Sequence, residues 1–307
     1  MATDYPPILL FAYTRPDHLQ RTVQTLAQNH GADKHPLFVF SDGPRSEQDL
    51  SAVEEVRRLA AGISGFNSVQ VIASEHNKGL AASIIGGVSQ LLEQWDSVIV
   101  LEDDMETSPY FLQYMREGLQ RYRDEPRVYS IHGYCYPISG DSIKGDSFFI
   151  RGTDCWGWAT WASAWEAFES DAGKLLQQLR TRGLVDQFDH DGAFPFSRML
   201  ARQQRGEVDS WAIRWNASVF LRDGLTLNPK YSLVRNIGLD GSGEHCEELD
   251  SYEAAVSKRP LKVDVEKLEP DPEAHRQISQ FLALQSGTLW RFKRWFRRIT
   301  FVDRFGK

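Results

Sequence analysis

The feature of this chain that most constrains its fold is an alternation of short apolar runs with longer amphipathic runs through its first half. The apolar runs have the length and β-branched content of strands, and they cover residues 8–12, 37–41, 69–73 and 97–101. The amphipathic runs have apolar residues at helical spacing, and they begin at Pro16 and cover 47–61, 80–95 and 108 to about 123. Strands that alternate with helices are typical of βαβ units. The sequence therefore predicts an α/β fold with a mostly parallel central sheet.

The second half of the chain is less regular. It is rich in aromatic residues and glycine at 148–165, has a helical pattern at about 170–182, and mixes charge with proline at 255–275. The expected organisation is one domain in two halves followed by two extensions. The boundaries are 1–254 for the domain (halves 1–133 and 134–254), 255–285 for a linker or helical extension, and 286–307 for a tail.

The composition is that of a soluble globular protein, with 41% hydrophobic and 25% charged residues. No run approaches the roughly 20 apolar residues of a membrane span, and the first residues lack the pattern of a signal peptide. We therefore expect a cytoplasmic protein. Cys135, Cys155 and Cys246 are too few and too scattered for a disulfide framework or a CxxC metal site, so they are predicted to be free thiols.

The net charge of −7 is unevenly distributed. Residues 290–307 contain seven basic residues and one acidic residue, so the preceding chain carries −13. An acidic body disfavours nucleic acid as a partner. In the tail, Phe292, Trp295, Phe296 and Ile299 form one helical stripe flanked by positive charge. This pattern is typical of a helix on an anionic membrane surface, and equally of a helix packed on the domain or on a partner subunit.

Three adjacent carboxylates, Glu102, Asp103 and Asp104, directly follow the apolar run at 97–101. The carboxyl ends of parallel strands are where α/β proteins place their sites. Adjacent carboxylates repel one another unless a cation or ordered donors offset them. Mg²⁺ and Mn²⁺ suit such oxygen ligands, together with the phosphates of a substrate. The alternative is a solvated acidic turn at the start of the next helix.

The segment around this triplet, Val98–Met105 followed by Ser108–Phe111, closely resembles the metal-binding motif of GT-A fold glycosyltransferases. It is most similar to the branch that holds family 2 bacterial sugar transferases and the GlcNAc-transferases that start complex N-glycans. Further similar segments follow in the family's order over about residues 5–250, namely Phe11–Pro16, Ser41–Gly43, Asn77–Ala81, Trp156–Trp161, Asp209–Trp211 and Asn236–Gly238 through Cys246. The resemblance implies a Rossmann-like GT-A three-layer sandwich with a nucleotide-binding half and an acceptor half. The composition of the tail adds a basic helical appendage at the C-terminus.

In such enzymes the loops after the first strands hold a nucleotide-diphosphate sugar. The donor contacts that the resemblance implies are Ala12, Tyr13, Arg15, Asp42, Lys78, Gly79, Glu102 and Asp103. Asp42 would face the base, Arg15 the diphosphate, and Asp103 the ribose or sugar. By residue chemistry alone, Asp42 equally fits a turn, Arg15 a helix start, and Lys78 a loop that enters a helix.

The resemblance also implies a divalent cation, Mn²⁺ or Mg²⁺. Asp104 would be its carboxylate ligand, and His245 would complete the site from the glycine-containing segment 241–245, which suits a loop that closes over the nucleotide. The cation would stabilise the leaving diphosphate as a Lewis acid. An isolated histidine is otherwise often a plain surface residue.

For the acceptor side, the resemblance implies a general base at Asp209, which would take the proton of the attacking hydroxyl. Many relatives carry a second acid where this chain has Ala212, so if that acid is the base, Asp209 or Asp240 replaces it or activity is lost. The tryptophans expected to bind the acceptor are Trp156, Trp158 and Trp211. Core packing is the alternative for such large aromatic side chains.

The function predicted from these features is metal-dependent transfer of a sugar, with inversion, from a nucleotide-diphosphate donor to a hydroxyl of a glycan or lipid-linked glycan. The expected context is synthesis of a surface polysaccharide such as O-antigen or capsule, at the inner face of the membrane. Two alternatives remain. A sugar nucleotidyltransferase is disfavoured by the glycine-free loop Ala12–Pro16, and a non-catalytic glycan-binding relative is favoured by Ala212.

Overall fold

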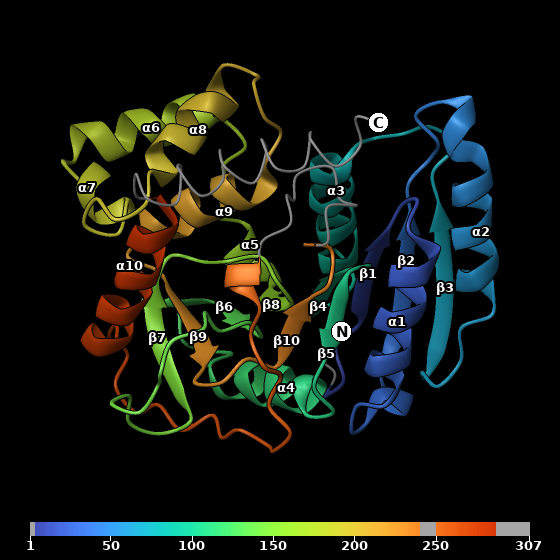
Figure 1. The fold of residues 1–307 in the computed structure, drawn as a ribbon, viewed down its shortest axis with the longest axis horizontal. Coiled ribbons are helices and arrows are strands. Elements are labelled where there is room, and N and C mark those ends of the chain that lie inside the picture. The colour runs from blue at the N-terminus through green and yellow to red at the C-terminus, as the bar shows by residue number, and fades with distance from the viewer. Residues whose placement is uncertain (1–3, 240–249, 287–307) are drawn as a thin grey trace, which may run out of the picture.

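A computed structural model describes residues 4–239 and 250–286 of the chain (Figure 1). In this part, eight strands form the central sheet in the order β3-β2-β1-β4-β8-β6-β9-β7, and β10 pairs with β5 in a separate ribbon. The strands are β1 (Ile8–Ala12), β2 (Pro36–Ser41), β3 (Ser68–Ala73), β4 (Ser97–Glu102), β5 (Met105–Thr107), β6 (Val128–His132), β7 (Ser147–Arg151), β8 (Trp158–Trp161), β9 (Leu225–Pro229) and β10 (Val234–Asn236). The four strands predicted in the first half are confirmed as β1 to β4.

The helices of the first half also follow the sequence pattern, and those of the second half surround the aromatic region. They are α1 (Pro16–Ala27), α2 (Leu50–Ala61), α3 (Leu80–Leu92), α4 (Phe111–Arg121), α5 (Ala162–Trp165), α6 (Ala172–Thr181), α7 (Val185–Phe188), α8 (Phe196–Gln204), α9 (Trp211–Phe220) and α10 (Pro272–Ser286). Short 3-10 turns occur at η1 (Ala32–Lys34), η2 (Glu47–Asp49) and η3 (Asp250–Tyr252). Pro16 opens α1 as expected, because proline's fixed φ suits the first turn of a helix.

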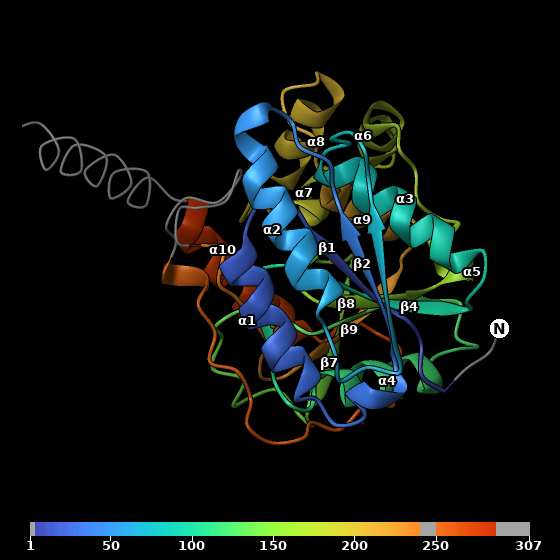
Figure 2. The same cartoon turned by 90° about the vertical axis from the view of Figure 1, so that its right-hand side faces the viewer.

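Alternation along β1 builds a core on each face of the sheet. Successive strand side chains point to opposite faces. Ile8 and Leu10 pack with buried residues of α1, α2 and α4, whereas Leu9 and Phe11 pack with α3, α5 and α9. Figure 2 shows α1 and α2 on one side of β1 and β2, and α3 on the other. The described part of the chain is therefore a three-layer arrangement of helices, sheet and helices.

The sheet has a parallel part and a mixed part. β3, β2, β1 and β4 are parallel neighbours, β6 and β9 are parallel, and β7 and β8 run antiparallel to their neighbours. Four of the seven pairings within the described central sheet are therefore parallel, which confirms the predicted mostly parallel α/β sheet. The register aligns Ala12 with Ser41 and Phe11 with Glu102. The loops after β1, β2 and β4 consequently leave the sheet at one edge, called here the carboxyl edge.

The segment predicted as a linker or helical extension packs against the domain. Leu261 is buried in the main core, and Val263 and Val265 pack against it. The helix α10 packs through Ile278 on Phe148 of β7. Both stretches therefore share apolar cores with the sheet. The basic tail at 287–307 lies outside the described residues, and no helix among 4–239 and 250–286 has the length and apolar character of a membrane span.

Candidate functional site at the carboxyl edge

The three adjacent carboxylates lie at the carboxyl edge, as predicted. Glu102 ends β4 and is partly buried, while Asp103 and Asp104 are buried in the turn that follows. Thr22 of α1 fixes this turn, since its hydroxyl donates to the Asp103 carbonyl at 2.7 Å and accepts from the Met105 amide at 3.1 Å. The carboxylates are therefore held by the fold and are not a solvated acidic turn.

Arg15 supplies a counter-charge to this cluster. Its guanidinium donates to Asp103 Oδ1 at 2.5 Å and to Asp104 Oδ2 at 2.7 Å. Burial alone would lower the pKa of Arg15, but the charges of Asp103 and Asp104 outweigh it and raise the pKa above its ordinary value. The other oxygen of Asp104, Oδ1, is buried and has no hydrogen-bond partner among the described residues. A buried carboxylate oxygen without a partner marks a position for a ligand, an ion or water.

Two of the carboxyl groups are electrostatically strained. Burial, followed by the negative charges of Asp104 and Asp103, raises the pKa of Glu102 well above its ordinary value. Burial also raises the pKa of Asp103, although Arg15 opposes the shift. Such shifts arise where negative charges share a site with little water, and an added cation relieves them. Added positive charge would therefore relieve the repulsion within this cluster.

Asp42 anchors the loop that precedes α3. Its Oδ1 accepts from the amides of Gly43 and Lys78, both at 2.9 Å, and its Oδ2 accepts from Gly79 at 2.9 Å. The amide of Asp42 in turn donates to the carbonyl of Ala12 at 3.1 Å. The structure thus brings together four of the predicted donor residues, in the loops after β1 and β2 and before α3. Most of the accepting capacity of Asp42 is used in holding these loops, which matches the turn role that its sequence also allowed.

Tyr13 joins this network from the loop after β1. Its amide donates to Asp103 Oδ2 at 3.3 Å, and its hydroxyl accepts from the Arg45 amide at 3.1 Å. Lys78 lies nearby with an exposed side chain. These contacts link Tyr13 and Arg15 to the acidic cluster, whereas Lys78 is linked through its amide to Asp42.

The late Asn-Ile-Gly segment closes over this cluster. The Ile237 amide donates to the Asp104 carbonyl at 2.8 Å. A Cβ on Gly238 would lie 2.3 Å from Asp104 Oδ2 and 2.7 Å from Arg15 Nη1, so a larger residue there would displace these two side chains. His245, predicted as the second metal ligand, lies outside the described residues, as does Asp240. Among 4–239 and 250–286 no group of three or more His, Cys, Asp or Glu residues is arranged to hold a metal ion.

The donor set that is present nevertheless fits a divalent cation. Asp104 offers a buried carboxylate oxygen without a partner, and Asp103 lies beside it on the same guanidinium. Mg²⁺ and Mn²⁺ are commonly bound through one or two carboxylates, with phosphate and water oxygens completing the shell. Asp104 and Asp103 are thus the residues that would hold such a cation.

The structure corrects part of the predicted acceptor site. Trp158 and Trp211 are only 1% and 3% exposed, and their rings stack on each other with centroids 5.2 Å apart. They form an interior group with Trp165 and Trp215, called here the tryptophan cluster. Because their faces are covered by other rings, Trp158 and Trp211 do not offer a stacking surface to a sugar. Trp156, in contrast, is partly exposed.

Asp209, the predicted base, lies in the loop before α9. Its side chain is 64% exposed, and its Oδ1 pairs with Arg214 Nη2 at 3.0 Å. Two residues later, Trp211 stacks on Trp158, which pairs with Val100 of β4 in the sheet. Asp209 therefore lies just before α9, the helix that covers the same face of the sheet as α3.

Sequence reasoning missed two contributors to the carboxyl edge. Arg57 of α2 ties the ends of β2 and β3 together, because its guanidinium donates to the Ser74 carbonyl at 2.6 Å and to the Asp42 carbonyl at 3.3 Å. Thr22 supports the acidic turn from α1. Both side chains lie in helices that the sequence indicates only by amphipathic spacing, so no local motif identified them as part of the site.

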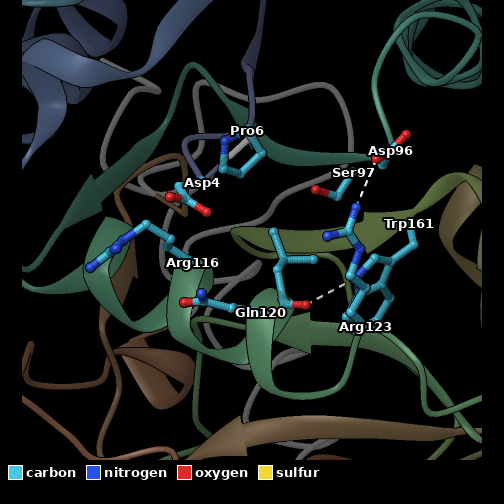
Figure 3. A pocket seen from close by; sticks show the side chains of 9 residues that line it. Asp4, Pro6, Asp96, Ser97, Arg116, Gln120, Arg123 and Trp161 are labelled. Carbon is cyan, nitrogen blue, oxygen red and sulfur yellow. Dashed lines mark hydrogen bonds and ion pairs between the residues drawn. The ribbon is translucent and has the colours of Figure 1, made fainter. Parts of the chain in front are cut away.

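A small pocket of about 70 Å³ lies at the opposite edge of the sheet, away from this site (Figure 3). It is lined by residues from the start of β1 and β4 and from α4. Arg123 spans part of it with an ion pair to Asp96 at 2.9 Å. Its modest volume and its distance from the acidic cluster along the strands separate it from the candidate site.

Comparisons with known proteins add little to this geometry. No protein-family model matches the chain. No curated protein matches it either. Among solved structures it is similar to S. aureus TarS, with 17% sequence identity and a TM-score of 0.27 over 41% of this chain and 21% of that chain. The matched region thus spans about a fifth of TarS, and a similarity this low carries no argument about function.

Proposed function

We propose that this protein is a glycosyltransferase that moves a sugar from a nucleotide-diphosphate donor to a hydroxyl of a glycan or lipid-linked glycan, on a GT-A type fold. The observation that carries the proposal is the buried pair Asp103 and Asp104 at the end of β4, with Asp104 Oδ1 lacking a partner among the described residues. Ligands of α/β proteins bind outside the carboxyl ends of parallel strands, where this pair lies.

The donor in this proposal lies across the loops after β1, β2 and β4. Arg15 and Lys78 supply positive charge for the diphosphate, since guanidinium and ammonium groups pair well with phosphate oxygens. The carboxylate of Asp42 holds the loop of Lys78 and Gly79 through their amides, and the Asp42 amide donates to the Ala12 carbonyl. Tyr13 and Glu102 border the same surface, and Asp103 faces the ribose or sugar.

Asp104 is the proposed carboxylate ligand of Mn²⁺ or Mg²⁺, with His245 as its second protein ligand. When bound, the cation supplies Lewis-acid stabilisation of the diphosphate that leaves. In this structure Arg15 forms ion pairs with both Asp103 and Asp104. Arg15 is therefore poised to hold the aspartates together without the donor and to offer its charge to the diphosphate when the donor is present.

Asp209 is the proposed general base. The hydroxyl oxygen of the acceptor bonds to the anomeric carbon, the bond from that carbon to the diphosphate oxygen breaks, and the hydroxyl proton passes to the Asp209 carboxylate. Attack from the face opposite the leaving diphosphate inverts the anomeric centre. The products are the extended glycan and a nucleoside diphosphate.

The proposed context is the synthesis of a surface polysaccharide such as O-antigen or capsule, with the protein at the inner face of the membrane. The support for a membrane location is the charge of the tail at 290–307, which is basic and aromatic while the rest of the chain is acidic. A basic amphipathic segment is attracted to anionic lipid. Flotation of the full chain with anionic liposomes, compared with a chain ending before Ser286, tests the membrane step. Equal flotation of the two chains would contradict it.

A thermal-shift panel tests the donor site. The full chain is heated with UDP-, GDP-, dTDP- and CMP-linked sugars, with and without Mn²⁺, because a ligand that binds only the folded state raises the melting temperature. We expect stabilisation by one base family that depends on Mn²⁺ and is lost in Asp104→Asn. Asp124→Asn, an exposed change after α4, is the matched control.

Three outcomes of this panel contradict the proposal or redirect it. Stabilisation without metal that survives Asp104→Asn removes the metal role of Asp104. No stabilisation by any donor favours a non-catalytic glycan-binding protein. Binding of a nucleoside triphosphate with release of pyrophosphate from a sugar phosphate favours a sugar nucleotidyltransferase.

A further inference from the structure

A second group of aromatic side chains lies at the carboxyl edge, around one carboxylate that none of the roles above uses. Its members come from the loop after β6, the loop between β7 and β8, the turn η3 and the helix α10. They are Tyr134, Tyr136, Trp156, Tyr252 and Phe281, called here the tyrosine cluster, with Asp154 beside them. In the view of Figure 1, the orange turn η3 lies between α10 and β10.

The register of the sheet places this cluster next to the proposed donor site. His132, the last residue of β6, pairs with Trp158, and Trp158 pairs with Val100 of β4. Val100 is two residues before Glu102. The loop that carries Asp154 and the loop that follows β6 therefore leave the sheet at the same edge as the acidic triplet, from neighbouring strands.

The rings of the tyrosine cluster stand edge to face. The centroids of Tyr134 and Trp156 are 4.6 Å apart at 72°, and those of Tyr134 and Tyr136 are 5.3 Å apart at 71°. The ring centroid of Tyr252 lies 6.1 Å from that of Trp156, so the rings of the tyrosine cluster together form a wall. Tyr134 is buried, while the other three are only partly buried. One ring thus anchors the group in the core, and the rest border solvent.

Asp154 is held at this wall but retains accepting capacity. The Tyr136 hydroxyl donates to its Oδ2 at 2.7 Å, and the Cys155 amide donates to its Oδ1 at 2.8 Å. A carboxylate offers about four accepting positions, and these bonds use one on each oxygen. The charge of Asp154 also reaches the neighbouring rings, since burial and then Asp154 raise the pKa of Tyr252 to about 12.

Two more polar atoms beside the wall have no hydrogen-bond partner among residues 4–239 and 250–286. They are Thr153 Oγ1 and His132 Nε2, and both belong to residues that are less than a tenth exposed. Buried polar groups in proteins are almost always paired. Thr153 directly precedes Asp154, and the ring of His132 lies 6.2 Å from that of Tyr134. Trp215 Nε1 in the tryptophan cluster lacks a partner in the same way, so the partly exposed carboxylate and its rings carry the case for a ligand.

We propose that Asp154 and the tyrosine cluster form a saccharide-binding subsite, in which sugar hydroxyls donate to Asp154 and the apolar face of a sugar ring packs on Trp156 or Tyr136. Ligand sites commonly combine an aromatic lining with a few placed polar groups, and this wall has both. Its identification as the acceptor subsite rests on the proposed function, because the donor site lies at the ends of the neighbouring strands. The binding of saccharide itself does not depend on that function.

The test measures saccharide binding without donor. The full chain is mixed with methyl glycosides of glucose, galactose, mannose and N-acetylglucosamine at millimolar concentration, and binding is followed by saturation-transfer NMR and tryptophan fluorescence. Asp154→Asn keeps the shape and an acceptor for Cys155 but removes the charge. Trp156→Phe keeps a ring but removes the reporter. Tyr231→Phe, an exposed tyrosine on the loop after β9, and Asp124→Asn are the matched controls.

We expect at least one glycoside to bind the unaltered chain, with affinity falling tenfold or more in Asp154→Asn and the fluorescence change disappearing in Trp156→Phe. Both controls should bind as the unaltered chain does. The proposal is overturned if no glycoside binds, or if folded Asp154→Asn binds unchanged. Glycoside binding without stabilisation by any donor supports the saccharide subsite and contradicts the proposed transferase. Stabilisation by a donor without glycoside binding supports the transferase and contradicts the subsite.

Discussion

The tryptophan cluster and the tyrosine cluster use similar side chains for different ends. In the tryptophan cluster, Trp158 and Trp215 are at most 1% exposed, and rings cover rings on the α3 face of the sheet. In the tyrosine cluster, Trp156 and Tyr136 border solvent and surround a carboxylate. Aromatic content alone therefore does not identify a sugar site. What separates the two is the partly exposed carboxylate of Asp154, which only the tyrosine cluster surrounds.

Trp156 and Trp158 show how close in sequence the two roles lie. Trp158 is in β8, where strand alternation directs its ring into the interior beneath α9. Trp156 precedes the strand and is separated from it by Gly157, whose φ of +63° turns the chain. A residue with a Cβ at Gly157 would also collide with Val234 at 2.7 Å. This turn lets two neighbouring tryptophans serve different sites.

The largest expected effect distinguishes the clusters by stability. Trp215→Ala should lower the free energy of unfolding by about 3–5 kcal/mol, because it leaves a large cavity in a fully buried ring cluster. Trp156→Ala, at a partly exposed position, should cost clearly less. Urea denaturation followed by circular dichroism measures both. Equal losses would mean that Trp156 is a core residue and would break the comparison.

The next effect concerns pH. Burial lowers the pKa of His35 to about 4, and it also lowers the pKa of His132, which lies between the two clusters. The unfolded chain takes up these protons near pH 6.5, but the folded chain does not. Stability is therefore complete above pH 7 and falls as the pH drops below 6.5, with His35 contributing a loss of about 2 kcal/mol at pH 5.

Denaturation curves between pH 5 and pH 7 measure this loss. His132→Asn and His35→Asn should each flatten the dependence on pH, because each removes one histidine that the fold keeps neutral. A slope that stays the same in both variants would show that neither histidine is held neutral by burial.

A third prediction separates the donor site from the tyrosine cluster. Asp104→Asn should weaken Mn²⁺-dependent donor binding by at least tenfold, about 1.4 kcal/mol, while leaving glycoside binding unchanged. Asp154→Asn should do the opposite. Titration calorimetry with donor and glycoside on both variants measures the four affinities. Loss of both ligands in either variant would show that the two regions form one site.

The smallest expected effect is at the exposed end of the tryptophan cluster. Asp209 pairs with Arg214 at 3.0 Å but is 64% exposed, and exposed ion pairs contribute about 0.2–1 kcal/mol. Asp209→Asn should therefore change the free energy of unfolding by less than about 1 kcal/mol, as seen by urea denaturation. A larger loss would make Asp209 part of the structural support of α9 and would weaken its proposed role as the base.

The sequence predicted the parallel part of the fold because its signals are local. Each apolar run and each amphipathic run of residues 8–123 carries its own periodicity, and the structure confirms them as β1 to β4 and α1 to α4. The ribbon of β5 and β10 was not predicted, since Met105 pairs with Asn236 across more than a hundred residues of chain. Three-residue strands carry no periodicity that could be recognised.

The part of the candidate site that could be predicted is the part whose position is set by the end of a strand. Asp103 and Asp104 follow a buried strand, so their place at the carboxyl edge followed from the fold class. The pairing of Arg15 with both carboxylates depends on how α1 packs, and the contact of Gly238 with Asp104 depends on a distant segment. Asp154 was missed because its neighbours come from four separate parts of the chain.

The most direct test of the central claim is a crystal structure of the chain with Mn²⁺ and the nucleoside diphosphate whose base the thermal-shift panel selects, or UDP if it selects none. We predict that the diphosphate lies between Arg15 and Asp104, with the base beside the loop of Lys78 and Gly79 and the metal on the Asp104 carboxylate. A nucleotide bound elsewhere, or Arg15 still paired with Asp103 and Asp104 and no nucleotide at the carboxyl edge, would contradict the account.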